Sequence, residues 1–186
     1  MIRGGEISKG TVLLNKGTPY LIVDREFVTP GKGAAFARVK MKNLRDGSVL
    51  TQTIKTSDLV EDATVNTHIA QFQYHDGENF VFMDTKSFEQ IPVSEKTIAD
   101  KRHYLREGDT YDIVVWEDEA IDVKIPVKMI FVVTEENIPG GETMSGTTKP
   151  VRTETGLVVR VPLFIKLGEK IMVNTESCEY QERVNS

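Results

Sequence analysis

Residues that carry metal or redox chemistry are scarce in this sequence. It contains one cysteine, Cys178, so no internal disulfide can form, and this usage fits a cytosolic protein. The three histidines, His68, His75 and His103, lack the close spacing of a zinc site, which a single cysteine could not complete. We therefore expect no metal centre and take the histidines as surface or satisfied polar residues.

Long apolar runs are also missing. The longest are short, such as residues 161–165, whereas a membrane span needs about 20 apolar residues. The N-terminal stretch MIRGGEISKG has neither an apolar core nor a small-residue cleavage site, unlike a signal peptide. These absences predict a cytoplasmic protein with no membrane contact.

Helical periodicity is nearly absent. The best candidate, residues 94–105, places Ile98 without apolar partners at 101 or 102 and predicts at most a short helix. No repeat is evident from sequence identity. Short segments rich in Val, Ile, Thr and Phe predict an all-β fold of sandwiches or small barrels. Strands are expected at residues 20–28, 36–44, 49–54, 80–83, 111–116, 124–133, 156–165 and 170–174.

Composition divides the chain into thirds. We expect boundaries at the acidic stretch 61–64 and near 125–128, giving domains 1–64, 65–128 and 129–186, each the size of one small barrel. The formal charge is −5, but the first third carries 10 basic against 7 acidic residues, while the second carries 7 against 13. On composition alone, an ordinary solvated strand face explains this basic surplus slightly better than a nucleic-acid surface does. The charge centres on Lys32, Arg38, Lys40, Lys42 and Arg45.

The segment between the two strongest strands of the first third predicts a protruding loop. Pro30 lacks a backbone donor and cannot continue a ladder, and Gly31 and Gly33 allow positive φ on both sides of Lys32. A lysine at such an apex cannot be buried, so it is open to a modifying enzyme or to a deep pocket on a partner. The alternative from local chemistry is a plain surface turn with a solvated lysine.

No catalytic motif is found. A phosphate-binding P-loop needs glycine at position 26 and Ser or Thr at position 33, where this chain has Glu26 and Gly33. The acidic residues 117–119 are interpreted as a solvated loop and Trp116 as core. No nucleophile with an identifiable base stands out, so we expect no enzyme and no catalytic residue.

Three segments resemble the elongation factor P family. They are FVTPGKGAAFARVKMKNL at 27–44, TETGLVVRVPLFI at 153–165, and the ending from GEKI at 168–171 to EYQERV at 179–184. Their order and spacing match over essentially the whole chain. Three co-linear motifs are far more specific than any one of them.

The resemblance implies a fold and a function. The fold is three small β-barrel domains in an L shape, an SH3-like (KOW-type) barrel followed by two OB-fold barrels. The function is that of a monomeric translation elongation factor that mimics tRNA and binds the 70S ribosome and its rRNA between the P and E sites. There it positions the P-site peptidyl-tRNA and stimulates peptide-bond formation, above all where consecutive prolines stall synthesis. An acidic tRNA mimic also agrees with the overall charge.

The resemblance further implies roles for residues of the tip. Lys32, flanked by Pro30, Gly31 and Gly33, matches the residue that contacts the CCA end of the P-site tRNA. In many members that residue is covalently extended by a modifying enzyme, so we expect such an extension here and no other cofactor. A longer cationic side chain contacts more phosphate and ribose.

Two further contact regions are implied in the last third. The segment 140–150 matches the loop that faces the small subunit and the E-site codon; within it, Glu142 stands where the family usually has Asp. Tyr180 and Arg183 match a C-terminal ribosome or tRNA contact, with a barrel-closing aromatic and a rim charge as the alternative. Cys178 stands where glycine is common. The predicted loop contacts are Gly141, Glu142, Thr143 and Gly146.

Two other functions stay open from the sequence. OB-like strand patterning alone is compatible with a general RNA-binding or chaperone module, which the acidic middle and last thirds disfavour. The paralogous factor-P-like protein of some bacteria is a narrower alternative, which the Pro-Gly-Lys-Gly tip disfavours.

Overall fold

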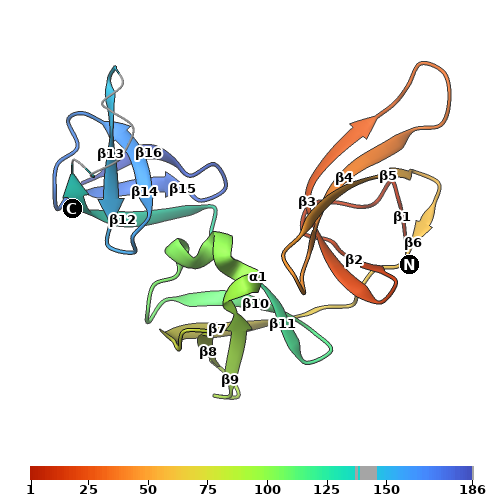
Figure 1. Cartoon of the computed structure of the whole chain (residues 1–186), viewed down its shortest axis with the longest axis horizontal. Coiled ribbons are helices and arrows are strands. Elements are labelled where there is room, and N and C mark those ends of the chain that lie inside the picture. The colour runs from red at the N-terminus through yellow and green to blue at the C-terminus, as the bar shows by residue number, and fades with distance from the viewer. Residues whose placement is uncertain (137, 139–145, 186) are drawn as a thin grey trace.

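The computed structural model describes residues 1–136, 138 and 146–185. It confirms the all-β prediction, with one short helical segment among the described elements. The strands form three successive units along a bent path, with the middle unit at the bend (Figure 1). No helix in these residues is long and apolar enough to cross a membrane.

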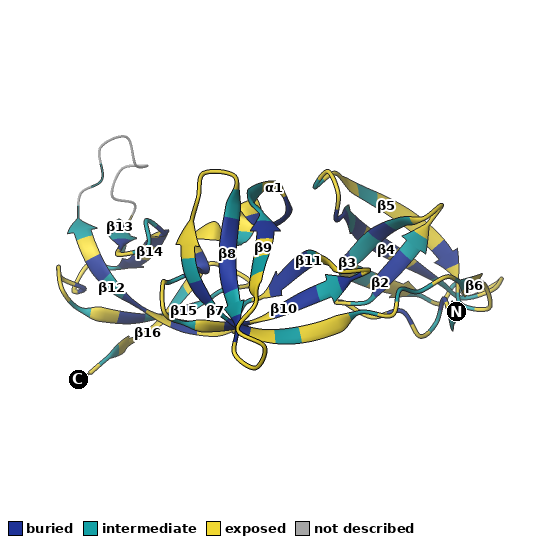
Figure 2. Ribbon diagram, turned by 90° about the horizontal axis from the view of Figure 1, so that it is seen from below, coloured by how far each residue is buried: buried dark blue, intermediate teal, exposed yellow. Residues whose placement is uncertain are grey.

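The first unit is a four-stranded sheet closed by a short strand pair. Buried and exposed residues alternate along β4, where Ala37, Val39 and Met41 face the core and Arg38 and Lys40 face solvent (Figure 2). The sheet order is β2-β3-β4-β5, and β1 pairs with β6. The strands are β1 (Ile2–Arg3), β2 (Val12–Asn15), β3 (Thr18–Val28), β4 (Phe36–Asn43), β5 (Val49–Lys55) and β6 (Leu59–Val60).

The middle and last units share one strand order. Numbered within each unit, both five-stranded sheets run 5-4-1-2-3. Contacts between β9 and β11, and between β14 and β16, bring the sheet edges together as in small barrels. This repeat is invisible in sequence identity. The strands are β7 (Asn66–His75), β8 (Asn79–Asp84), β9 (Gln90–Ser94), β10 (Thr110–Trp116), β11 (Glu119–Lys124), β12 (Lys128–Glu136), β13 (Thr148–Thr153), β14 (Val158–Pro162), β15 (Lys170–Asn174) and β16 (Glu179–Val184).

The helical segment lies between β9 and β10, where a short helix was expected. It consists of α1 (Glu95–Ile98) and the 3-10 turn η1 (Ala99–Tyr104). Ile98 is fully buried in the core of the middle unit, whereas Tyr104 packs into the core of the last unit. The segment therefore joins two units.

The first and middle units meet through an apolar cluster and one lysine. Val12 and Leu44 pack against Val114 and Trp116, so Trp116 is core as expected, but in the joint between two units. Lys42 does not lie on a solvated face. Its ammonium donates to the Thr97 carbonyl oxygen at 3.0 Å and to Asp100 at 2.8 Å in the helical segment, and its side chain is only 15% exposed.

The middle and last units meet around the Phe131 ring. The Tyr104 ring lies 6.3 Å away between centroids, and the Arg106 guanidinium lies 5.7 Å above the Phe131 centroid. Arg106 also donates to the Ile130 carbonyl oxygen at 2.9 Å. His103 Nδ1 lies 3.1 Å from the Thr155 carbonyl oxygen. These contacts use apolar and polar groups together, which favours one orientation of the two units.

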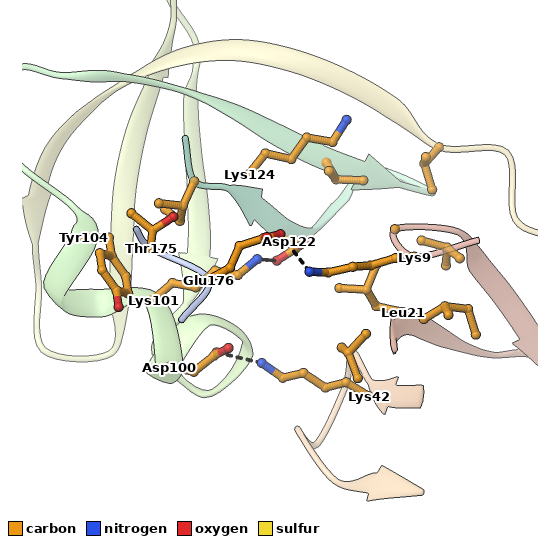
Figure 3. A pocket seen from close by; sticks show the side chains of 17 residues that line it. Lys9, Leu21, Lys42, Asp100, Lys101, Tyr104, Asp122, Lys124, Thr175 and Glu176 are labelled. Carbon is orange, nitrogen blue, oxygen red and sulfur yellow. Dashed lines mark hydrogen bonds and ion pairs between the residues drawn. The ribbon is translucent and has the colours of Figure 1, made fainter. Parts of the chain in front are cut away.

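All three units border one cavity of about 660 Å³ (Figure 3). An ion pair between Lys9 of the first unit and Glu176 of the last crosses it at 2.7 Å. Lys101 is paired with Asp122 inside the middle unit. The first and last units thus touch directly, although neither is next to the other in the chain.

Asp84 closes the turn between β8 and β9. Its carboxylate accepts the backbone N–H groups of Ser87 at 2.9 Å and Lys86 at 2.7 Å, and lies 2.8 Å from His68 Nδ1. These hydrogen bonds, those from the backbone first and that from His68 after them, lower its pKa from 3.8 to about 2. The turn is therefore stabilised by an ionised carboxylate above about pH 4, and that stabilisation is lost as the pH falls toward about 2.

We predict that Asp84→Asn lowers the unfolding midpoint at neutral pH and flattens its dependence on acid. The variant keeps an acceptor oxygen but has no carboxylate to protonate, so it loses less between about pH 5 and pH 2 than the parent. Chemical denaturation at a series of pH values measures this. Asp112→Asn, at an exposed position of β10, is the matched control. Parallel pH profiles of parent and Asp84→Asn would contradict the assignment.

We also predict that Lys42→Met loosens the joint between the first and middle units. The substitution keeps the apolar stem and removes the ammonium, which leaves the Thr97 carbonyl oxygen without its donor. We expect a loss of about 1 kcal/mol of stability. Lys40→Met, at an exposed position of the same strand, should leave stability unchanged.

Spin labels measure the geometry of this joint. They are placed at exposed positions of the first and middle units, Thr53→Cys and Glu107→Cys, in a Cys178→Ser background. Lys42→Met should broaden the distance distribution, and Lys40→Met should not. An unchanged distribution in both variants would show that the apolar cluster alone sets the angle.

Candidate functional site

The paired strands β3 and β4 extend from the first unit as an arm (Figure 1). Their ladder runs from Tyr20↔Asn43 to Val28↔Phe36, with a bulge between Ile22 and Asp24. A bulge adds local twist and redirects the strand beyond it. The arm thus projects the loop 29–35 away from the barrel.

Lys32 lies at the end of the arm and is exposed. Its ammonium has no hydrogen-bond or ion-pair partner in the part of the chain that the structure describes. The glycines beside it differ: Gly33 has φ +110°, whereas Gly31 is outside the left-handed region. Pro30 is half-buried and touches the space beside Gly33. Positive φ was expected to be possible at both glycines, and of the two only Gly33 adopts it.

The root of the loop is held by hydrogen bonds. Thr56 donates to the Ala35 carbonyl oxygen from its backbone N–H at 3.1 Å and from its hydroxyl at 3.0 Å. Gly4 lies so close to the end of β5 that a Cβ there would stand 2.2 Å from the Lys55 carbonyl oxygen. Only glycine fits at this contact. The lysine thus sits on a short loop with a firmly attached base.

The arm carries charge of both signs. On its solvent face Arg38 pairs with Glu26 at 3.0 Å, and both side chains are more than half exposed. Lys40 and Lys55 are exposed as well. Two basic residues of the first third, Lys42 and Lys9, are instead drawn into contacts with the other units, as described above. The arm presents cations to solvent that a polyanion could reach.

The side chain of Phe27 was missed by the sequence reasoning. It is 53% exposed on the arm, and the Arg25 guanidinium lies 5.4 Å from its ring centroid. Arg25 is itself anchored by a bond from Nη2 to the Gly5 carbonyl oxygen at 3.0 Å. An aromatic residue in a strand usually indicates core, so only its position next to a turn could have suggested otherwise.

The predicted residues of the last unit are partly outside the described chain. Gly141, Glu142 and Thr143 lie there and stay predictions. Gly146 is exposed and has φ +64°, a conformation suited to glycine. Gly146 belongs to the last unit, whereas Lys32 belongs to the first.

Tyr180 and Arg183 lie on β16 of the last unit. Tyr180 is half-buried against the core, as in the barrel-closing alternative. Arg183 is 45% exposed, pairs with Glu169 at 3.2 Å and lies 5.9 Å from the Phe164 ring centroid. Phe164 is 59% exposed and was not predicted. The surface here combines a cation with an aromatic ring.

Among the described residues, the histidines and acidic residues considered as metal ligands or catalytic groups do not form a common cluster. His68 pairs with Asp84, and His75 stacks on Phe80 at 4.3 Å, so both have structural partners. Across residues 1–136, 138 and 146–185, no three His, Cys, Asp or Glu side chains converge as a metal site would require. Glu117 and Asp118 form the β10–β11 turn with positive φ at both. This agrees with an exposed acidic turn.

Cys178 is exposed with φ +57°, in the turn before β16. This left-handed backbone conformation explains why glycine suits the position of Cys178. The Cys178 thiol also affects Tyr104: burial raises the pKa of Tyr104 strongly, and a hydrogen bond with the thiol raises it further.

Three family models match this chain in sequence order. One described as "Elongation factor P (EF-P) KOW-like domain" matches residues 3–60. One described as "Elongation factor P (EF-P) OB domain" matches residues 65–123, and "Elongation factor P, C-terminal" matches residues 127–183. Together they span nearly the whole chain.

Individual proteins are similar as well. A protein named "Elongation factor P" from Treponema denticola is 74% identical over 187 residues, covering 100% of both chains. Another of that name from Borrelia hermsii is 43% identical, covering 98% of this chain and 97% of its own. A solved structure of "Eukaryotic translation initiation factor 5A from Methanococcus jannaschii" is 20% identical, with a TM-score of 0.48 over 67% of this chain and 91% of that one.

We predict that Gly33→Ala distorts the tip loop and that Gly31→Ala does not. A residue other than glycine at φ +110° costs roughly 1–3 kcal/mol, so the loop should change conformation. At Gly31 an added Cβ meets nothing within 4 Å, and no positive φ is needed. Amide chemical shifts of residue 29 and residues 31–35 report the difference, and equal shift changes in the two variants would refute it.

Proposed function

The chain belongs to the elongation factor P family, and from this premise we propose that it binds the ribosome between the P and E sites as a tRNA mimic. There it positions the P-site peptidyl-tRNA and stimulates peptide-bond formation at consecutive prolines. One observation carries the proposal: Lys32 is exposed, has no partner among the described residues, and lies on a loop whose root is held by hydrogen bonds. The ribosome remains the catalyst, and the proposed factor contributes positioning.

The charge and reach of the tip support contact with the tRNA end. An ammonium on a flexible stem approaches phosphate and ribose oxygens without a fixed geometry. The loop places it beyond the bulk of the first unit, while the ladder behind it limits its lateral movement. To position a tRNA end, the Lys32 ammonium must extend far from the first unit while its lateral movement is restricted.

We extend the proposal to a covalent extension of Lys32. The described residues leave its ammonium uncovered, so a modifying enzyme can approach it without unfolding the loop. An extended cationic group would contact more of the CCA end. Intact mass measurement of the native protein, with peptide mapping around Lys32, detects such a group.

The last unit supplies the second proposed contact, with the small subunit. Gly141, Glu142, Thr143 and Gly146 would face the E-site codon. Arg183 would contact RNA phosphate, and Tyr180 would support it from the core of the barrel. We propose that the protein acts in the cytoplasm, where ribosomes are, and as a monomer.

We predict that Lys32→Ala abolishes stimulation of peptide-bond formation on a proline-rich template. The loss follows from removing the cation that approaches the tRNA end. Lys32→Arg should keep part of the effect of the unmodified protein but gain nothing from the lysine-modifying system. The measurement is the rate of Pro-Pro bond formation on reconstituted ribosomes with saturating factor.

Lys16→Ala is the matched control. Lys16 is an exposed lysine in the β2–β3 turn, also followed by a glycine of positive φ, but it lies off the arm. It should stimulate like the parent. Equal rates with and without the modified parent protein would overturn the proposed function, and full activity of Lys32→Ala would overturn the role of Lys32.

A further inference from the structure

Phe27 is exposed for a structural reason. It lies on β3 directly opposite Ala37 of β4, and the alanine side chain is too short to cover the ring. Ala37 itself is fully buried in the core of the first unit, so the ring extends that face of the sheet beyond the barrel. A phenylalanine needed only for the core would be covered by its neighbours.

One face of this ring is already occupied by a fixed cation. Arg25, two residues earlier on the same face of the strand, lies over the ring at 5.4 Å. Its guanidinium is held by the Gly5 carbonyl oxygen, and its Nε is enclosed without a hydrogen-bond partner among the described residues. No second ring or cation of the described chain contacts Phe27. The ring therefore has one cationic neighbour, and about half of the residue, 53%, is exposed to solvent.

We propose that the Phe27 ring, backed by Arg25, is a stacking platform for an unpaired nucleobase at the 3′ end of the tRNA. This inference rests on the proposed function and adds a positioning residue to it. Lys32 would approach the backbone, while Phe27 fixes the plane of a base. An aromatic face is sequence-tolerant because every base has a π face, which suits a factor that meets many tRNAs.

The chemistry distinguishes this role from simple apolar bulk. Stacking needs a flat π surface, so leucine of similar volume cannot replace it, whereas tyrosine and tryptophan can. Loss of one base–aromatic stack corresponds to roughly a tenfold effect. A residue that only packs against the root of the arm would instead follow size and apolarity.

The test compares Phe27→Leu, Phe27→Tyr and Phe27→Trp in Pro-Pro bond formation, after thermal melting shows which variants fold. We expect Phe27→Leu to lower the rate at saturating factor about tenfold, and the aromatic variants to stay within about twofold of the parent. Phe88→Leu makes the same change at a 69% exposed phenylalanine of the middle unit and should have no effect.

Tryptophan at position 27 gives a second readout. The native Trp116 is only 8% exposed, so subtracting the signal of the parent protein on the same ribosomes leaves the fluorescence of the tryptophan at position 27. Quenching of this difference signal reports stacking there. We expect quenching with intact P-site tRNA and none with tRNA lacking its 3′-terminal nucleotides. This readout stands even if Phe27→Leu fails to fold.

Each outcome decides a separate claim. If the parent protein stimulates but Phe27→Leu equals it, or if all three variants fall equally, the platform is refuted and the proposed function stands. Quenching that is the same with truncated tRNA also refutes the platform. If the parent protein gives no stimulation, the proposed function is refuted. Quenching that occurs with intact P-site tRNA but not with truncated tRNA would then still support contact between residue 27 and a base.

Discussion

The arrangement of the whole molecule depends on how one helical segment, α1 and η1, is held by all three units. Lys42 of the first unit donates to its backbone and to Asp100, Ile98 anchors it in the middle core, and Tyr104 inserts into the last core. Each unit alone is small enough for its stability to be marginal. Sharing core residues across joints gives each barrel additional buried surface and, at the same time, defines its orientation. The direction of the arm relative to the last unit follows from these contacts.

Much of this fold could be predicted from sequence, because its signals are local. Alternation along β4, the glycines around Lys32 and the scarcity of helical periodicity are each read within a few residues. The joints could not be predicted, because Lys42 and Thr97 are far apart in the chain and a basic residue in a strand looks solvated. Trp116 was recognised as core, but its partners Val12 and Leu44 belong to another unit. The repeated strand order stayed hidden because topology is preserved by burial pattern and not by residue identity.

The candidate site divides in the same way. Lys32 was found because proline and glycine force a turn there, whereas Phe27 was missed because exposure of an aromatic depends on the residue across the ladder. Ala37 leaves it open, and that pairing exists only once the register is known. The exposure of a strand side chain thus depends also on the size of the residue paired with it on the neighbouring strand. The parts that stabilise the loop and the part that is free for contact are also separate, since the hydrogen bonds of Thr56 hold the root of the loop, while Lys32 at its apex has no partner in the described part of the chain.

The ion pair between Lys9 and Glu176 has a mechanical consequence. Three units joined only to their neighbours can change their angle at each of the two joints. A third contact, between the first and last units, restrains both angles together. Here that link is an exposed pair, 60% and 54% accessible, and such pairs contribute about 0–1 kcal/mol, close to thermal energy. Dissolved salt weakens it, and a nearby polyanion competes for the lysine. The pair therefore adds a weak, salt-sensitive restraint between the outer units to the contacts that already hold the two joints.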